Sequence, residues 1–198
     1  MIGSSVYMVD LDNTCYDLIE GLQRRLMAKF GYVLKREDVR QYSLAGLTGN
    51  PVADTDIINA LQDPDFFASL RPFPGAAEAL ARLAEDGDLV FVSGRPPDFR
   101  VVSNAALRRD FPGLPIHAVH HTRGKVRMAK QYHSRIAIDD HPGTAVKYAN
   151  QHVMCYLLRT PYIGEVPRSR YLSVVSSLKE AVDEILSPIM EHRKVEAS

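Results

Sequence analysis

The sequence predicts an α/β fold in which a doubly wound parallel sheet carries a small helical insertion after its first strand. Short apolar runs without polar alternation recur along the chain, which is typical of strands buried on both faces of a parallel sheet. Helical patterns separate these runs, except in residues 16–71, where helical patterns stand alone. This alternation predicts a Rossmann-like sheet, and 198 residues suffice for one such domain with an insertion.

Five segments are predicted to be strands. Four of them are apolar and rich in strand-forming residues, and each stops at a polar or turn residue. These four are residues 6–9, 89–92, 135–138 and 153–158. Residues 115–119 are a weaker candidate. No strand is predicted after 153–158, so this segment is expected to be the last strand of the chain.

The segments between the strands carry apolar residues at helical spacing. In the first of them, Ala79, Leu80 and Leu83 share one face, and Gly87 follows the end of the pattern. The predicted helices of this part cover residues 76–85, 99–109, 125–132, 143–151 and 178–186. The last of these is amphipathic and is expected to close the fold.

Residues 16–71 contain no convincing strand. Their helical patterns cover residues 18–30, 36–42 and 54–61, and the last pattern runs into Asp63-Pro64. We therefore expect residues 16–71 to form a helical cap over the carboxyl end of the first strand. The core would then consist of residues 1–15 and 72–198.

The composition is that of a soluble globular protein, with 24 Lys/Arg, 24 Asp/Glu and 45% hydrophobic residues. No apolar run approaches the roughly 20 residues needed to cross a membrane. Asp10 and Asp12 interrupt the apolar stretch near the N-terminus, which argues against a signal peptide. Two cysteines, Cys15 and Cys155, are too few for a disulfide framework. We expect a cytoplasmic protein without a membrane partner, and the sequence predicts no oligomeric state.

Basic side chains are concentrated in residues 95–135, which hold nine Lys/Arg against two Asp/Glu. Such a stretch is usually a solvated face. It also lacks an evident aromatic platform on which nucleic-acid bases could stack. Its position beside polar strand ends nevertheless favours contact with an anionic substrate.

Two acids follow the first predicted strand, in Asp10-Leu11-Asp12. Residues two apart in a strand point the same way, so a sheet could aim both carboxylates at one spot. Open α/β sheets bind ligands at the carboxyl ends of their strands. One carboxylate could then act as a nucleophile or metal ligand while the other exchanges a proton. A plain turn is the competing interpretation, because Asp and Asn are common after strands.

Polar residues at other strand ends favour a functional site. Ser93-Gly94-Arg95 offers a hydroxyl and backbone N–H groups before a helix, as in a phosphate cradle. Asp139-Asp140 ends a third strand, although one of the two acids could serve only as a helix cap. Lys125 precedes a helix and offers a point charge for a phosphate oxygen. Each feature alone has a common structural explanation, but the ordered set points to an anion site.

This ordered set resembles the haloacid dehalogenase-like phosphohydrolase superfamily. That superfamily's pattern is hhhhDxDx(T/V), then hhh(S/T), then Lys, then an acidic pair that ends a strand. Here it reads Val6 to Thr14, Leu89 to Ser93, Lys125 and Ile138-Asp139-Asp140. The resemblance covers about residues 5–145 and implies an enzyme with a Rossmann-like core. Lys130 matches the lysine less well, because it lies within a predicted helix.

The resemblance also implies roles. Asp10 would attack phosphorus and form an aspartyl-phosphate intermediate, and Asp12 would protonate the leaving oxygen and then activate water. The phosphoryl group of the substrate would be bound by Ser93, Gly94, Arg95 and Lys125.

Mg²⁺ is the cofactor that the resemblance implies, since a hard ion that keeps waters suits an anion attacking a phosphate. Asp10 and the backbone carbonyl of Asp12 would hold the ion together with an acid of the final pair. Asp140 is favoured as the direct ligand, with Asp139 behind it or contacting the ion through water. The ligand set is therefore Asp10, Asp12, Asp140 and Asp139.

Two finer resemblances point to nucleotides. Val92-Ser93-Gly94-Arg95, with Arg100 nearby, is similar to the phosphatase domain of phage-type polynucleotide kinases. The acidic strand end and single cap resemble 5′(3′)-deoxyribonucleotidases. The GxxxxGK(S/T) loop of a kinase is absent. Asn13-Thr14-Cys15 stands where deoxyribonucleotidase-like motifs often continue with Gly-Val.

We predict a phosphatase that acts on a nucleotide or another small phosphorylated metabolite. The alternatives are a polynucleotide 3′-phosphatase, a phosphomutase with the same two acids, and a binding module without catalysis. A dehalogenase typically lacks the second acid, so Asp12 argues against that reaction. A net charge of zero favours a small substrate, because polynucleotide binders usually carry a basic face. Tyr162 is expected to line the site.

Overall fold

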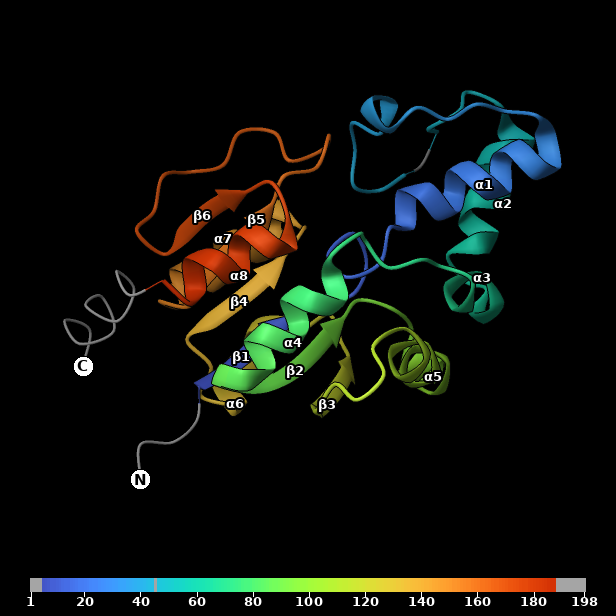
Figure 1. Ribbon diagram of the computed structural model, residues 1–198. Coiled ribbons are helices and arrows are strands. Elements are labelled where there is room, and N and C mark those ends of the chain that lie inside the picture. Colours follow the sequence, from blue (N-terminus) through green and yellow to red (C-terminus); the bar gives the residue numbers. More distant parts are fainter. Residues whose placement is uncertain (1–4, 45, 188–198) are drawn as a thin grey trace.

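Parallel strands form the central sheet in the order β3-β2-β1-β4-β5-β6, and helices cover both of its faces (Figure 1). The computed structural model describes residues 5–44 and 46–187. Its strands are β1 (Ser5–Val9), β2 (Gly87–Ser93), β3 (Ile116–His121), β4 (Ile136–Asp139), β5 (Met154–Leu158) and β6 (Leu172–Val175). The chain extends the sheet from β1 first towards β3 and then, from β4, in the other direction. This is the doubly wound Rossmann-like arrangement, and it confirms the predicted fold class.

The five predicted strands are all present, with ends within two residues of those expected. The sixth strand was not predicted, so the expectation that residues 153–158 form the last strand is wrong. β6 has four residues, three of them only partly buried, and it pairs with β5. So short an edge segment carries little pattern of its own, and its conformation depends on the pairing.

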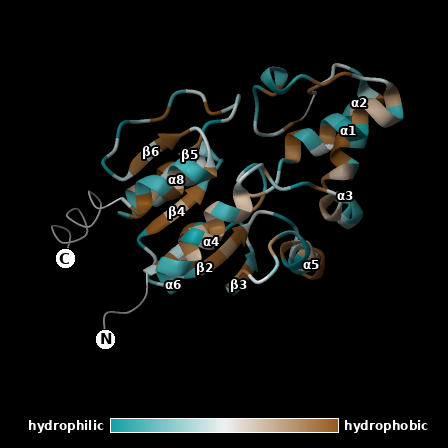
Figure 2. Ribbon diagram, in the orientation of Figure 1, coloured by the Kyte–Doolittle hydropathy of each residue, from teal (hydrophilic) through white to brown (hydrophobic). Residues whose placement is uncertain are grey.

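Helices on the two faces of the sheet enclose two separate apolar clusters. The helices of this part are α4 (Ala76–Asp86), α5 (Arg100–Asp110), α6 (Lys125–Gln131), α7 (Pro142–Asn150) and α8 (Leu178–Ile185), with a 3₁₀ turn, η2 (Pro97–Phe99), before α5. Neighbouring strand residues alternate between the clusters: Tyr7 and Val9 belong to one, and Met8 to the other. Figure 2 shows hydrophobic strands between helices of mixed colour, as expected for a sheet buried on both faces.

The described residues of the segment 16–71 form three α-helices and one 3₁₀ turn. They are α1 (Leu18–Phe30), η1 (Arg36–Asp38), α2 (Pro51–Ala60) and α3 (Pro64–Ala68). α1 has the predicted bounds: the Asp17 carboxylate caps its start, and Gly31 ends it with φ of 62°.

Three helix predictions in this segment need correction. The helix expected at 54–61 begins earlier, as α2, because the Asn50 side chain caps it and Pro51 occupies its first turn. The helix expected at 36–42 is a single 3₁₀ turn, because the chain leaves the helical region at Val39, whose side chain is fully buried. α3 was not predicted at all. Asp63-Pro64 was interpreted as the end of a helix, whereas the Asp63 carboxylate caps a new helix and Pro64 occupies its first turn.

Figure 1 shows α1, α2 and α3 beyond the carboxyl ends of the strands. Contacts attach them to the sheet domain: the rings of Phe67 in α3 and Phe99 lie 5.6 Å apart, and Arg109 Nη1 donates to the Ala68 carbonyl at 2.8 Å. An isolated bridge between Tyr16 and Pro72 joins the two connecting segments. The helical segment therefore lies at the edge of the sheet where open α/β folds bind ligands.

Candidate active site

Three neighbouring strands end at the candidate site. Asp10 directly follows β1, Ser93 is the last residue of β2, and Asp139 is the last residue of β4. β1 lies between the other two strands and pairs with both. Because β1 and β4 lie where the strand order reverses, their ends flank the crevice typical of ligand binding in this fold.

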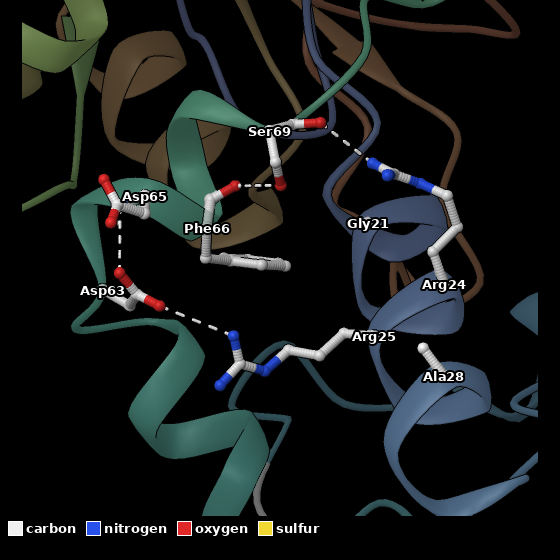
Figure 3. A pocket seen from close by; sticks show the side chains of 8 residues that line it. All are labelled: Gly21, Arg24, Arg25, Ala28, Asp63, Asp65, Phe66 and Ser69. Atoms are coloured by element: carbon white, nitrogen blue, oxygen red, sulfur yellow. Dashed lines mark hydrogen bonds and ion pairs between the residues drawn. The ribbon is translucent and has the colours of Figure 1, made fainter.

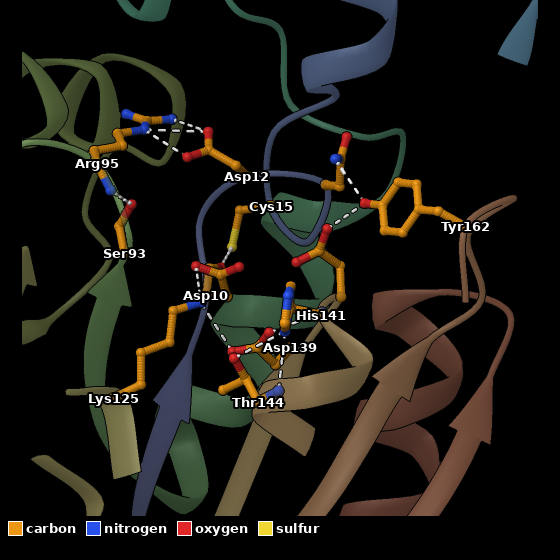
Figure 4. Close-up of polar contacts among 12 residues, drawn as sticks. Asp10, Asp12, Cys15, Ser93, Arg95, Lys125, Asp139, His141, Thr144 and Tyr162 are labelled. Atoms are coloured by element: carbon orange, nitrogen blue, oxygen red, sulfur yellow. Dashed lines mark hydrogen bonds and ion pairs between the residues drawn. The ribbon is translucent and has the colours of Figure 1, made fainter. Parts of the chain in front are cut away.

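Asp10, Asp139 and Asp140 form a buried cluster in which one oxygen from each carboxylate lies within 4.8 Å of the others. Lys125, the first residue of α6, extends into this cluster (Figure 4). Its Nζ lies 2.8 Å from Oδ1 of Asp10 and 2.9 Å from Oδ2 of Asp139. The structure therefore brings Asp10 together with Lys125 and the adjacent pair Asp139-Asp140, more than 110 residues later in the sequence, as the sequence predicted.

The charges in this cluster are not balanced within the protein. Burial raises the pKa of Asp10 well above its ordinary value, Lys125 opposes that rise, and the neighbouring acids add to it. Burial and then Asp139 raise the pKa of Asp140 to about 6. Burial alone would lower the pKa of Lys125, but Asp10 and Asp139 outweigh it and the pKa is raised. Three carboxyl groups thus surround one ammonium, and a further cation would stabilise the ionised forms of the acids whose pKa is raised.

The two acids at the end of β4 have different partners. Asp139 is bonded through both oxygens: Oδ2 accepts from Lys125, and Oδ1 accepts from the His141 amide at 2.9 Å. Asp140 accepts a hydrogen bond on Oδ2 from the Tyr162 hydroxyl. The contact with Asp140 places Tyr162 beside the acid cluster.

Asp12 points away from the acid cluster, towards Arg95 (Figure 4). Arg95 Nη2 donates to Asp12 Oδ1 at 2.6 Å, and Nε donates to Oδ2 at 2.9 Å. We expected Asp10 and Asp12 to be aimed at one spot by strand alternation. β1 ends at Val9, so the two-residue alternation no longer applies to the loop that follows.

The predicted phosphate cradle follows β2. Ser93 is fully buried, and its hydroxyl accepts from the Arg95 amide at 3.1 Å. Gly94 is exposed, and a Cβ there would meet no atom within 4 Å. The Arg95 guanidinium is engaged with Asp12, and its pKa is raised: burial would lower it, but Asp12 outweighs burial.

Asn13 belongs to the site although the sequence did not predict it. Its φ is 54°, a left-handed conformation that Asn tolerates better than most residues. Its Nδ2 donates to the Tyr162 hydroxyl at 2.8 Å, so Asn13, Tyr162 and Asp140 form a chain of hydrogen bonds. The signal in the sequence was an Asn directly after Asp-x-Asp, where a tight turn needs this conformation.

Tyr42, from the helical segment, also reaches the site. Its ring lies edge-on to His141 at 4.1 Å and to Tyr162 at 5.7 Å. Burial and the nearby Asp140 raise the pKa of Tyr42. Nothing in the sequence pattern singled out Tyr42, because it lies in a loop that contacts the core only through the tertiary fold.

A surface pocket of about 420 Å³ lies in the helical segment, and none of the acids of the cluster at the strand ends lines it (Figure 3). It is lined by Gly21, Arg24, Arg25, Ala28, Asp63, Asp65, Phe66 and Ser69. Its arginines already have partners: Arg25 pairs with Asp56 and Asp63, and Arg24 donates to the Ser69 carbonyl.

The fold is shared with hydrolases of the haloacid dehalogenase-like type. L-2-haloacid dehalogenase from Xanthobacter autotrophicus is 14% identical with a TM-score of 0.59, over 93% of this chain and 99% of that one. A haloacid dehalogenase-like hydrolase from Burkholderia xenovorans LB400 is 20% identical with a TM-score of 0.55, over 91% and 96%. CbbY from Rhodobacter sphaeroides, solved with xylulose-(1,5)bisphosphate, is 14% identical with a TM-score of 0.56, over 89% and 96%. The chain thus has the fold of the haloacid dehalogenase-like hydrolases, as the sequence motifs predicted.

Residues 4–164 match the family described as 5′ nucleotidase, deoxy (pyrimidine), cytosolic type C protein. The chain belongs to this family, and it is a phosphomonoester hydrolase. No curated protein matches the chain significantly. In the described ranges, 5–44 and 46–187, no helix is long and apolar enough to span a membrane.

Proposed function

We propose that this protein is a Mg²⁺-dependent phosphatase that hydrolyses phosphate monoesters through an aspartyl-phosphate on Asp10. The substrate is a nucleotide or another small phosphorylated metabolite. The observation that carries the proposal is the contact between buried Asp10 and Lys125, beside Asp139 and Asp140. This arrangement offers a carboxylate nucleophile next to charges that suit a phosphate and a cation.

The residues present fit Mg²⁺. The cluster offers oxygen donors, the kind that hard cations prefer, and its three carboxylates exceed its one ammonium. Asp10, Asp140 and the backbone carbonyl of Asp12 would hold the ion. Asp139 suits an outer position, because Lys125 and the His141 amide already bond its two oxygens. When bound, the ion offsets the negative charge of the acids and of the substrate phosphate.

In the proposed reaction, an Asp10 oxygen attacks phosphorus and the ester oxygen leaves, with a proton from Asp12. Water then attacks the phosphorus of phospho-Asp10, and Asp12 accepts the water proton. Lys125, Ser93 and the Gly94 N–H bind the phosphoryl oxygens. Binding of phosphate by Arg95 stays a prediction, since the Arg95 guanidinium is bonded to Asp12.

Three observations support a small substrate. The chain belongs to a nucleotidase family. Residues 16–71 lie beyond the strand ends, where a helical cap would enclose a ligand and exclude water. Tyr42 from this segment packs on His141 and Tyr162, so aromatic side chains lie beside Asp140. A non-catalytic role is disfavoured, because every residue that the reaction needs is present.

The experiment is turnover of a panel of phosphate monoesters, with and without Mg²⁺, by the wild type and by Asp10→Asn. The amide is nearly isosteric with the carboxylate but is not a nucleophile. We expect turnover only in the wild type and only with the metal. Near-wild-type turnover by folded Asp10→Asn protein would overturn the proposal.

A further inference from the structure

The Arg95 side chain is buried, and it is bonded to protein on several sides. Its Nε and Nη2 donate to both carboxylate oxygens of Asp12, and its Nη1 donates to the Ser103 hydroxyl at 2.9 Å. The guanidinium carbon lies 4.5 Å from the centre of the Phe67 ring and 5.7 Å from that of Tyr16. Hydrogen bonds from its N–H groups therefore fix the guanidinium within its own plane, and the aromatic rings of Phe67 and Tyr16 pack against it.

These contacts come from separate parts of the fold. Ser103 is in α5 of the core, whereas Phe67 is in α3 of the helical segment. A guanidinium fork bonded to both oxygens of a carboxylate fixes its orientation as well as its position. Without the fork, the Asp12 side chain, which is 19% exposed, could rotate among its staggered conformations.

We propose that Arg95 is a positioning residue that holds the Asp12 carboxylate in the orientation from which Asp12 accepts a proton from water. This inference rests on the proposed function, in which Asp12 is the acid–base group. In this role Arg95 acts through Asp12, which is the alternative to the phosphate-binding role that the sequence predicts for it. The packing of Phe67 on the guanidinium makes the helical segment part of this support.

The step that depends on Arg95 is hydrolysis of phospho-Asp10. The water oxygen forms a bond to phosphorus, the bond between phosphorus and the Asp10 oxygen breaks, and the water proton goes to Asp12. A displaced Asp12 leaves the water without an acceptor, and a misplacement of about 1 Å can slow an enzymatic step about 10²-fold. The preceding step needs no proton when the leaving group is p-nitrophenolate.

The test is rapid-quench and stopped-flow kinetics with p-nitrophenyl phosphate and Mg²⁺. In Arg95→Met we expect a burst of p-nitrophenolate of about one equivalent per active site, then steady turnover about 10²-fold slower than wild type. Phosphoenzyme should accumulate to match the burst. A phosphate-binding role predicts the opposite, a lower kcat/KM without a burst, and that result would overturn the inference.

Arg109→Met is the matched control. Arg109 also links α5 to the helical segment, through the Ala68 carbonyl, but it does not contact Asp12. We expect near-wild-type kinetics from this variant. An equal burst in Arg109→Met would show that loosening the helical segment suffices, and would overturn the role of Arg95.

Two further variants keep the test decisive. If Arg95→Met does not fold, Ser103→Ala removes one anchor of the guanidinium and should slow the same hydrolysis step; an unchanged rate contradicts the inference. Arg95→Met in an Asp12→Asn background should add no further slowing, because both changes remove one function. Failure of the proposed function looks different, since Asp10→Asn would then retain turnover whatever Arg95 does.

Discussion

Lys125 Nζ lies 2.8 Å from Oδ1 of Asp10, in a site where both side chains are almost completely buried. The same ammonium is 2.9 Å from Asp139. Breaking a buried ion pair by removing one partner typically costs about 3–5 kcal/mol, because the other charge is left without compensation. Lys125 therefore contributes to the stability of the site as well as to its chemistry.

Replacing Lys125 tests this double role. We expect Lys125→Met to lower the free energy of unfolding of the metal-free protein by about 3–5 kcal/mol and to abolish phosphatase turnover. Lys130→Met is the matched control, because Lys130 is exposed on the same helix and should change stability by less than about 0.5 kcal/mol. Urea unfolding and phosphatase turnover are measured for both variants. Equal losses of stability and turnover in Lys125→Met and Lys130→Met would contradict the double role of Lys125.

The pKa of Asp140 implies that the metal-free protein becomes less stable as the pH rises. The folded-state pKa of about 6 lies above the ordinary 3.8, so folding favours the protonated acid. This contribution is complete below pH 4 and is lost as the pH rises through about 6. This rise in the pKa of Asp140 corresponds to about 3 kcal/mol.

We therefore expect the Asp140 contribution to raise the melting temperature of chelated protein at pH 4.5 relative to pH 8, and Mg²⁺ to stabilise the protein more at pH 8. Asp140→Asn should reduce this pH dependence. Asp56→Asn is the control, because Arg25 lowers the pKa of Asp56 to about 2, so its titration lies outside this window. The wild type is compared with Asp140→Asn because burial lowers the pKa of His121 and of His141, which makes both proteins more stable as the pH rises. A difference in melting temperature, wild type minus Asp140→Asn, that grows from pH 4.5 to 8 would contradict the sign of the Asp140 effect.

Tyr162 is expected to support the metal site through Asp140. Its hydroxyl donates to Oδ2 of Asp140 and accepts from Asn13. Loss of such an outer hydrogen bond typically weakens metal affinity about 10–100-fold. Tyr162→Phe should therefore bind Mn²⁺, measured by calorimetry without substrate, more weakly than wild type. Unchanged affinity would show that Tyr162 only packs beside the site.

The choice between the two acids of β4 is measured in the same way. Asp140→Asn should weaken Mn²⁺ binding more than Asp139→Asn, because Asp139 is bonded to Lys125 and to the His141 amide. A larger loss in Asp139→Asn would mean that the direct ligand is Asp139.

Sequence patterns predicted the strands that carry the chemistry because those strands are buried on both faces and are therefore apolar throughout. They also predicted that Asp10, Lys125, Asp139 and Asp140 would meet, since the ends of parallel strands share one edge. β6 escaped prediction because only its pairing with β5 makes it a strand.

The contacts between side chains could not be predicted from spacing. Arg95 stood in a phosphate-binding motif, yet its guanidinium turns to Asp12, which a loop conformation presents to it. Tyr42 reaches His141 only because the helical segment folds back over the strand ends. Both contacts depend on tertiary packing, which no local pattern records.

The substrate class is tested by competition between a nucleoside monophosphate and a 3′-phosphorylated oligonucleotide at two salt concentrations. We expect the higher kcat/KM for the small ester, with little dependence on salt, because the chain has no net positive charge. A clearly higher kcat/KM for the oligonucleotide that falls steeply with salt would favour polynucleotide end processing.

The central claim is that Asp10 carries the phosphoryl group. Asp12→Asn should slow hydrolysis of the intermediate by about 10²–10⁴-fold, so the intermediate should accumulate in this variant. The measurement is mass spectrometry of Asp12→Asn protein that is quenched in acid after brief reaction with p-nitrophenyl phosphate and Mg²⁺. We predict one phosphoryl group, located on Asp10 and absent from the Asp10→Asn protein. A phosphoryl group on another residue, or turnover without any labelled protein, would contradict the account.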